Sequence, residues 1–263
     1  MKIYKICEEK LYYLEYSTNT IKVYLSYIDE FLTKIGKHYS RLNANDFEQY
    51  LKAYNYTSTS QKNQVISAIQ FLYKHGLNKK YRKVSFQRPR EESKLPQVID
   101  KNHILQRIDS IKNIKHKAII SLAYSVGLRV SEVINLKVKD IDSDRMIINI
   151  KNAKGRKDRI VPLTLNMLHL LRVYYKHYRP IDYLFNGQFS NQYSQTSCNN
   201  IVKKYLGHQY HFHLLRHSCF TNLTDEGIDI RVIQKLAGHK SSKTTEIYTH
   251  VSNSVLKKLP LAL

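Results

Sequence analysis

The chain has 263 residues, and its 43 lysines and arginines against 21 aspartates and glutamates give a formal net charge of +22. An excess of this size usually attracts a polyanion, and nucleic acid is the leading candidate, although a lysine-rich surface from AT-rich coding is an alternative. The most apolar stretch, AIISLAYSVGL, is too short for a membrane span, and the charged N-terminus has no apolar export segment. Three widely spaced cysteines indicate no disulfide framework. We therefore expect a cytoplasmic protein without a membrane segment.

The first eighty or so residues predict a small helical bundle. Residues 19–35 place apolar side chains at spacings of three and four, which is typical of an amphipathic helix. Asn45 is the expected cap of a second helix, and Ser58 or Thr59 the expected cap of a third, which Gly76 would end.

A basic segment with two prolines and no apolar period follows, over residues 79–97. This composition is typical of an interdomain linker. The predicted division is a helical domain over residues 1–85, a linker over 86–98, and a second domain over 99–263.

The second domain is predicted to be mostly helical with a small sheet. Asp100 is the expected cap of its first helix, and the segment IKHKAIISLAYSVG ends at Gly127 as a helix would. RMIINI and KDRIVPL predict two short strands joined by a turn. Further helices are expected around residues 164–177, 194–205, 213–225, 229–236 and 242–249. The predicted fold class is mainly α with a small antiparallel β-sheet.

In the segment GLRVSE, Arg129 follows a helix-ending glycine at the start of a new helix. A helix N-terminus favours an anion, and an arginine beside it can bind two phosphate oxygens. Glu132 would hold the guanidinium from behind. The same six residues are also compatible with an ordinary helix stop and restart.

The predicted hairpin turn lies in NAKGRKDR and places Lys154 at its tip. A turn lysine between small residues can reach out to give up a proton or to contact a groove. Exposed hairpin lysines are commonplace, so this turn alone does not indicate a function.

In HFHLLRH, His213 and Arg216 are three residues apart and share one face of a predicted helix. A titratable imidazole beside a permanent cation suits a reacting phosphate, because the arginine can hold its oxygens while the histidine transfers a proton. One alternative is a metal site, because His213 and His217 have the spacing of helical ligands and His208 and His211 lie near. The other is a purely structural histidine pair.

The segment AGHKSSKTTEIYTH places His239 after a helix-ending glycine and Tyr248 on a short polar helix nine residues later. A phenol has a pKa near 10, so a reacting tyrosine needs cations around it. The basic residues that would supply them are Arg129, Lys154, His213, Arg216 and His239. As a packing residue, Tyr248 needs none of these neighbours.

Taken in this order, the segments resemble the tyrosine recombinases, the phage-integrase and Xer-like family. The resemblance is carried by GLRVSEVINLKVKDID, NAKGRKDRIVPL and HLLRHSCFTNLTDEGIDIRVIQKLAGHKSSKTTEIYTHV, and weakly by the helical N-terminal domain. It implies a core-type DNA-binding bundle followed by a catalytic domain. Ala237 stands where the family usually has leucine, which should alter packing only. The chain leaves no room for an additional N-terminal arm-binding domain, so we expect a simple recombinase of two domains.

The resemblance implies that Arg129 and Arg216 clamp the scissile phosphate, which His239 hydrogen-bonds in the transition state. Glu132 and His217 match supporting positions.

It also implies that Tyr248 is the nucleophile and forms a 3′-phosphotyrosyl link. Lys154 would act as general acid to the leaving 5′-oxygen, and His213 would assist proton transfer. The link conserves the bond energy, so no metal, ATP or other cofactor is expected.

The implied partner is double-stranded DNA with paired core sites, bound by a homotetramer that is a monomer or weak oligomer when free. We expect the apolar tail VSNSVLKKLPLAL to dock either on its own domain or on a neighbouring subunit. Two other functions are open, a type IB topoisomerase-like nicking and closing enzyme and a catalytically silent DNA-binding relative. The intact set of six reacting residues argues against the silent relative.

Overall fold

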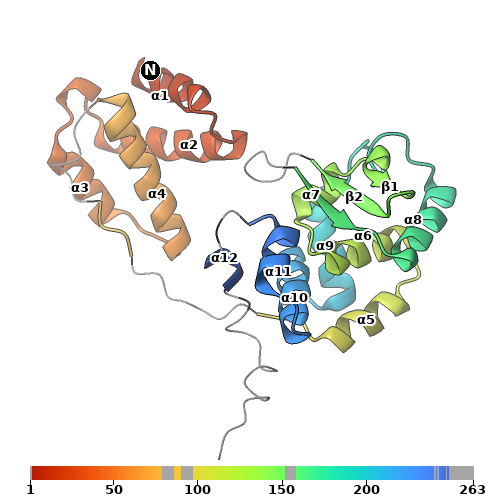
Figure 1. The fold of residues 1–263 in the computed structure, drawn as a ribbon. Helices are drawn as coiled ribbons and strands as arrows, with labels where there is room; N and C mark the ends of the chain where they lie inside the picture. The colour runs from red at the N-terminus through yellow and green to blue at the C-terminus, as the bar shows by residue number, and fades with distance from the viewer. Residues whose placement is uncertain are drawn as a thin grey trace, which may run out of the picture. The chain divides into compact units, whose positions relative to one another are not determined.

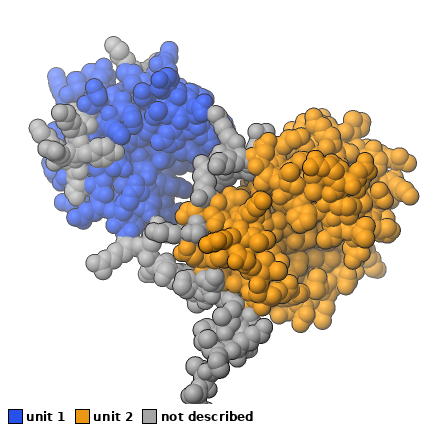
Figure 2. Space-filling model, viewed as in Figure 1, with its two compact units in different colours: residues 1–93 blue, residues 94–263 orange. Residues whose placement is uncertain are grey.

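The chain divides into two compact units, residues 1–93 and 94–263 (Figures 1 and 2). The computed structural model describes residues 2–78, 86–89, 97–151, 158–239, 241, 243–246 and 248. Within these residues, no helix is both long and apolar enough to cross a membrane. The predicted linker falls largely outside them, since residues 90–96 are not described.

The described part of the first unit is helical. Its elements are α1 (Lys2–Tyr13), α2 (Thr18–Ile35), a 3₁₀ turn (Tyr39–Arg41), α3 (Ala44–Ala53), α4 (Thr59–Phe71) and a π-helical turn (Leu72–Gly76). The helix expected over residues 19–35 is therefore present as α2. Helix α1 was not predicted, although Ile3, Cys7 and Leu11 recur at a spacing of four and are all buried.

The caps of α3 and α4 follow from short side chains before each helix. Asn43, rather than the expected Asn45, caps α3, because Asn43 Oδ1 accepts from the Asp46 amide while Asp46 Oδ2 accepts from the Asn43 amide at 2.9 Å. This reciprocal pair is a capping box, which an Asn45 cap would not form with Asp46. Ser58 caps α4 as predicted.

The second unit is mainly helical with one small sheet, which confirms the predicted fold class. Its helices are α5 (Lys101–Ser110), α6 (Ile114–Ser125), α7 (Val130–Asn135), α8 (Leu165–Tyr178), α9 (Gln195–Leu206), α10 (Phe212–Asp225), α11 (Ile230–Ala237) and α12 (Lys243–Glu246), with a 3₁₀ turn at Val138–Asp140.

The sheet is antiparallel and has the strand order β1-β2-β3. The strands are β1 (Ile141–Asp142), β2 (Ile147–Ile150) and β3 (Arg159–Pro162). The two predicted strands are β2 and β3, with Ile148 opposite Val161, and β1 is an addition. The predicted turn between β2 and β3 lies outside the described residues.

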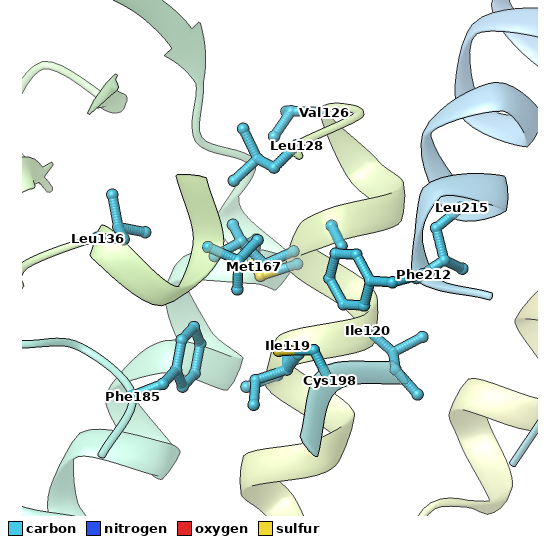
Figure 3. Close-up of a cluster of buried hydrophobic side chains, with 14 of the residues drawn as sticks. Ile119, Ile120, Val126, Leu128, Leu136, Met167, Phe185, Cys198, Phe212 and Leu215 are labelled. Atoms are coloured by element: carbon cyan, nitrogen blue, oxygen red, sulfur yellow. The ribbon is translucent and has the colours of Figure 1, made fainter. Parts of the chain in front are cut away.

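Helix α6 runs through the core of the second unit. Its segment AIISLA is apolar almost all round because both α8 and α10 pack against it. Figure 3 shows apolar side chains of α6 meeting those of α10, among them Ile120 and Phe212. This packing holds the end of α6 close to α10, where the candidate site is found.

Candidate active site

The first site residue in the chain, Arg129, follows a turn at Gly127. The chain leaves α6 through Gly127 at φ +64°, in the left-handed region that favours glycine. A Cβ at this position would overlap the ring of Phe220 on α10. After this turn, Arg129 has an extended backbone conformation and is the N-cap residue of α7.

Glu132, in the first turn of α7, binds two arginines. Its Oε1 accepts from Arg129 Nη1 at 2.8 Å and from Arg159 Nη1 at 2.7 Å, while its Oε2 accepts from Arg159 Nη2 and from the Arg129 backbone amide, both at 2.8 Å. Burial alone would raise the pKa of this carboxyl, but Arg159 and then Arg129 outweigh burial and lower the pKa to about 2. Glu132 is therefore a carboxylate at neutral pH and holds Arg129 as expected.

The place of Arg159 in the site was not predicted. Its Nε donates to the Leu236 carbonyl at 2.9 Å, so that Arg159 joins β3 to both α7 and α11. Its side chain is 8% exposed, against 18% for Arg129. Arg129 is thus the member of the pair that is open to a substrate.

Arg216, on α10, is 1% exposed and held by backbone carbonyls. Its Nη1 donates to the Gly127 carbonyl at 2.5 Å and its Nη2 to the Ala237 carbonyl at 2.7 Å. The guanidinium carbon lies 4.7 Å from the centre of the Phe220 ring. Burial, and then Arg129, lower the pKa of Arg216 to about 10, which leaves it charged at neutral pH.

His239 follows Gly238, which ends α11 at φ +64°. The Nε2 of His239 lies 3.0 Å from Arg216 Nη2, and its Nδ1 lies 2.9 Å from Thr245 Oγ1. Burial, and then the charge of Arg216, lower the pKa of His239 to about 4, so the ring is neutral at physiological pH. Sequence reasoning missed Thr245, whose side chain is fully buried.

Tyr248 lies just beyond α12 rather than on it. The predicted helix over residues 242–249 is therefore too long, since α12 ends at Glu246. Tyr248 is in a turn, and its backbone amide donates to the Thr245 carbonyl at 3.0 Å.

The ring of Tyr248 is 2% exposed and surrounded by site residues. Its centre is 5.4 Å from the Phe220 ring, 5.7 Å from the His217 ring and 6.4 Å from the His239 ring, to which it is nearly parallel. Burial raises the pKa of Tyr248, and the charges of Arg216 and Arg129 offset only part of this rise. The phenol is therefore protonated in the free protein.

His213 and His217 extend the cluster along α10. Their rings meet edge to face with centres 4.6 Å apart, so the imidazole of His213 is partly covered although the residue as a whole is exposed. Desolvation, and then His217 and Arg216, lower the pKa of His213 to about 4. The Nδ1 of His217 is buried and has no hydrogen-bond partner among the described residues.

The structure brings seven of the predicted site residues into one cluster, namely Arg129, Glu132, His213, Arg216, His217, His239 and Tyr248. The eighth, Lys154, lies outside the described residues, as does the predicted docking of the tail. The described part of the chain contains no group of three or more histidine, cysteine or acidic side chains placed to hold a metal ion. Chemically, the cluster combines two guanidinium groups that suit an anion with neutral imidazoles and a buried phenol.

Comparison with known proteins identifies the family. The phage integrase family matches residues 97–254, and the N-terminal SAM-like domain of phage integrases matches residues 3–83. Tyrosine recombinase XerA of Pyrococcus horikoshii is 33% identical, with 96% of this chain and 91% of the relative covered, and XerA of Pyrococcus furiosus is 33% identical with 97% and 92% covered. A crystal structure of XerA recombinase matches at 29% identity and a TM-score of 0.57 over 97% of this chain and 95% of that one. The fold also matches XerH bound to its difH substrate, at 24% identity and a TM-score of 0.72 over 90% and 78%. The chain therefore belongs to the phage integrase family and is a tyrosine recombinase.

Proposed function

We propose that the chain is a site-specific DNA recombinase that cleaves and rejoins DNA strands through a 3′-phosphotyrosyl intermediate at Tyr248, without a metal ion or ATP. The observation that carries the proposal is the burial of Tyr248 in the same cluster as Arg216 and His239, next to the more open Arg129. The net charge of +22 suits a nucleic-acid substrate.

Arg129 and Arg216 are the proposed clamp for the scissile phosphate. Each guanidinium is oriented before substrate arrives, Arg129 by Glu132 and Arg216 by two backbone carbonyls. Donors fixed in this way stabilise charge that develops on the phosphate in the transition state. His239 adds a hydrogen bond to the same group.

In the reaction, the Tyr248 oxygen forms a bond to phosphorus while the bond from phosphorus to the 5′-oxygen breaks. Lys154 donates a proton to the leaving oxygen, and His213 assists removal of the phenolic proton. Because the pKa of Tyr248 is raised in the free protein, the phenol keeps its proton until the attack itself, and the proton is transferred as the bond to phosphorus forms. Rejoining is the reverse attack by a 5′-hydroxyl, which requires no added energy source.

The test is to trap the covalent intermediate on a nicked half-site. Cleavage of this substrate frees a short fragment that carries the 5′-hydroxyl, and because the fragment diffuses away, the strand cannot be rejoined. Wild type should form a protein–DNA adduct that survives denaturing electrophoresis, with EDTA present and ATP absent. Tyr248→Phe should form none. The control is Tyr174→Phe, which alters another buried tyrosine of the second unit whose hydroxyl donates to the Leu184 carbonyl. Adduct formation by Tyr248→Phe would refute the nucleophile, and a wild type that binds DNA but forms no adduct would indicate a silent relative.

The role of Lys154 is tested separately. A 5′-bridging phosphorothiolate has a sulfur leaving group that departs without a proton, so this substrate should restore cleavage to Lys154→Ala. If the variant stays as slow as on normal DNA, Lys154 is not the general acid.

The proposed partner is double-stranded DNA with paired core sites, held by a homotetramer in the cytoplasm. Light scattering on the free protein and on its complex with paired sites measures the stoichiometry. Four chains on two duplexes would support the proposal, whereas one chain on one duplex would favour a topoisomerase-like activity.

A further inference from the structure

The hydrogen bonds around His239 determine which ring nitrogen carries its proton. A guanidinium can only donate, so His239 Nε2 accepts from Arg216 Nη2 across 3.0 Å. The ring is neutral, so its one proton lies on Nδ1 and is donated to Thr245 Oγ1 at 2.9 Å. The free protein therefore holds the Nδ1–H tautomer.

This tautomer is the wrong one for the proposed reaction. A neutral His239 can donate to a phosphate oxygen through Nε2 only if Nε2 carries the proton. Nδ1 then has no proton and needs a donor, because a buried acceptor without a partner is unfavourable. The partner of Nδ1 must consequently accept in the free protein and donate in the complex.

Thr245 is suited to this exchange. Its hydroxyl both donates and accepts, whereas a backbone carbonyl or a carboxylate at the same place would only accept. The side chain is fully buried, so no bulk water is available to replace it. Thr245 also accepts through its backbone carbonyl from the Tyr248 amide, which ties it to the proposed nucleophile.

We propose that Thr245 is a positioning residue that lets His239 change from the Nδ1–H tautomer, bound to Arg216, to the Nε2–H tautomer, bound to the scissile phosphate. The inference rests on the proposed function. In the exchange, the Thr245 hydroxyl takes the proton from Nδ1 and gives up its own, which passes to solvent, so that the hydroxyl changes from acceptor to donor toward Nδ1. Nε2 takes one proton from solvent as DNA enters, so the number of protons on the ring is unchanged. The charge of the ring does not change, and the N–H of Arg216 Nη2 that was bound to His239 becomes available to the phosphate, while the other N–H stays on the Ala237 carbonyl.

The protein groups around His239 favour a neutral ring in the free protein, and the same groups oppose the protonation that a bound phosphate would favour. Arg216 and His217 face it from α10, Arg129 from the start of α7 and Arg159 from β3, and all of them disfavour a second proton on the imidazole. Tyr248 stacks against it at 6.4 Å.

The first test is direct observation of the tautomer by nuclear magnetic resonance of nitrogen-labelled histidine. The free protein should show His239 protonated at Nδ1. The complex of Tyr248→Phe with an uncleaved half-site should show protonation at Nε2. The same tautomer in both states, or a doubly protonated ring in the complex, would overturn the inference. This readout does not depend on cleavage.

The second test is the cleavage rate of Thr245 variants. Thr245→Val keeps the shape but removes the hydroxyl, and it should slow cleavage roughly 10- to 100-fold while half-site affinity changes little, because the lost contact matters when charge builds up. Thr245→Ser should restore most of the rate. The matched control is Thr221→Val, which removes another buried threonine hydroxyl of the second unit.

A double-mutant cycle shows whether Thr245 acts through His239. In a His239→Ala background, Thr245→Val should reduce the rate little further, since the residue that it positions is gone. Equal losses with and without His239, or a Thr245→Val rate equal to wild type, would refute the inference and leave the proposed function intact. Failure of wild type to form any Tyr248 adduct would refute the proposed function, whatever the tautomers show.

Discussion

Glu132 and the two arginines that share it show how a single carboxylate can organise the site. Arg159 donates hydrogen bonds to both oxygens of Glu132, and its side chain is almost completely buried. The side chain of Arg129 donates to only one of these oxygens and is partly exposed to solvent. Arg159 therefore acts on a substrate through Glu132 and Arg129.

Replacing Arg159 tests this indirect role. Arg159→Lys keeps the charge but loses the forked contact, so Glu132 is free to turn and Arg129 moves with it. We expect cleavage to fall roughly 10- to 100-fold, as for a misplaced reacting group, with half-site binding largely retained. Single-turnover cleavage and equilibrium binding measure the two effects. Arg172→Lys, on the exposed face of α8, is the control, and an equal loss there would refute the specific role of Arg159.

Glu132 also makes stability depend on pH. Its pKa is about 2 in the folded protein against an ordinary value of 4.5, a difference that corresponds to roughly 3 kcal/mol. Because the folded pKa is the lower one, this contribution is fully present above about pH 5 and is lost as the pH falls toward 2. Glu132→Gln should be less stable than wild type at pH 7, and the difference in unfolding free energy between the two proteins should disappear as the pH falls from about 5 toward 2.

Denaturant unfolding at several pH values checks the expectation. Asp109→Asn, which removes an exposed carboxylate with a 3.9 Å ion pair, should show almost no gap at any pH. A gap for Glu132→Gln that stays constant from pH 7 to pH 2 would contradict the assignment.

At the scale of helices and turns, local patterns predicted most of the architecture. Apolar spacing located α2, which buries one face in a core, and the glycine stop at Gly127 marked the end of α6. The cap of α3 was misplaced by two residues, since Asn43 and Asn45 look alike until the partner at Asp46 is considered. The length of α12 was overestimated because the turn at Tyr248 is held by contacts with other helices.

The same limit applies to the site. Its motif residues were recognisable because the family resemblance joins segments that are far apart in the chain. Arg159 and Thr245 were not, since their roles depend on contacts that only folding creates. Arg159 reaches Glu132 across 27 positions, and the bond from Thr245 to His239 requires the chain to fold back after α11. Local spacing carries no information about either contact.

The turn at Gly127 provides a test at this scale, because Gly227 supplies a matched glycine. Both have positive φ, +64° and +82°, so alanine is strained at each. At Gly127 the new Cβ also overlaps Phe220, whereas at Gly227 it meets no atom of the described structure within 4 Å. We expect Gly227→Ala to cost about 1 kcal/mol and Gly127→Ala clearly more.

Gly127→Ala should in addition slow cleavage, because the Gly127 carbonyl positions Arg216. Thermal unfolding and single-turnover cleavage distinguish the two effects. Equal stability losses for the two variants would show that the Phe220 contact is not limiting.

For the whole molecule, the dominant property is its charge. A protein of net charge +22 that binds DNA must displace many counterions, so its affinity for a half-site should fall linearly on a plot of log affinity against log salt. For about 6 to 10 phosphate contacts, the loss between 50 and 200 mM salt is roughly 10³- to 10⁵-fold. Fluorescence anisotropy of a labelled half-site measures this slope.

Arg129→Ala should reduce the magnitude of this slope by about one, as expected for the loss of a single phosphate contact. An affinity that barely changes with salt would contradict polyanion binding. An unchanged slope in the variant would place Arg129 away from the phosphate.

The anchoring of Arg216 has a consequence for how such a protein diverges. Two of its hydrogen-bond partners are the peptide carbonyls of Gly127 and Ala237, which belong to the backbone rather than to a side chain. The position of the guanidinium thus depends on the backbone conformation, and neighbouring side chains can be exchanged as long as that conformation is kept. Anchoring of this kind depends little on side chains, so it tolerates exchanges on the scale that separates this chain from its 33% identical relatives.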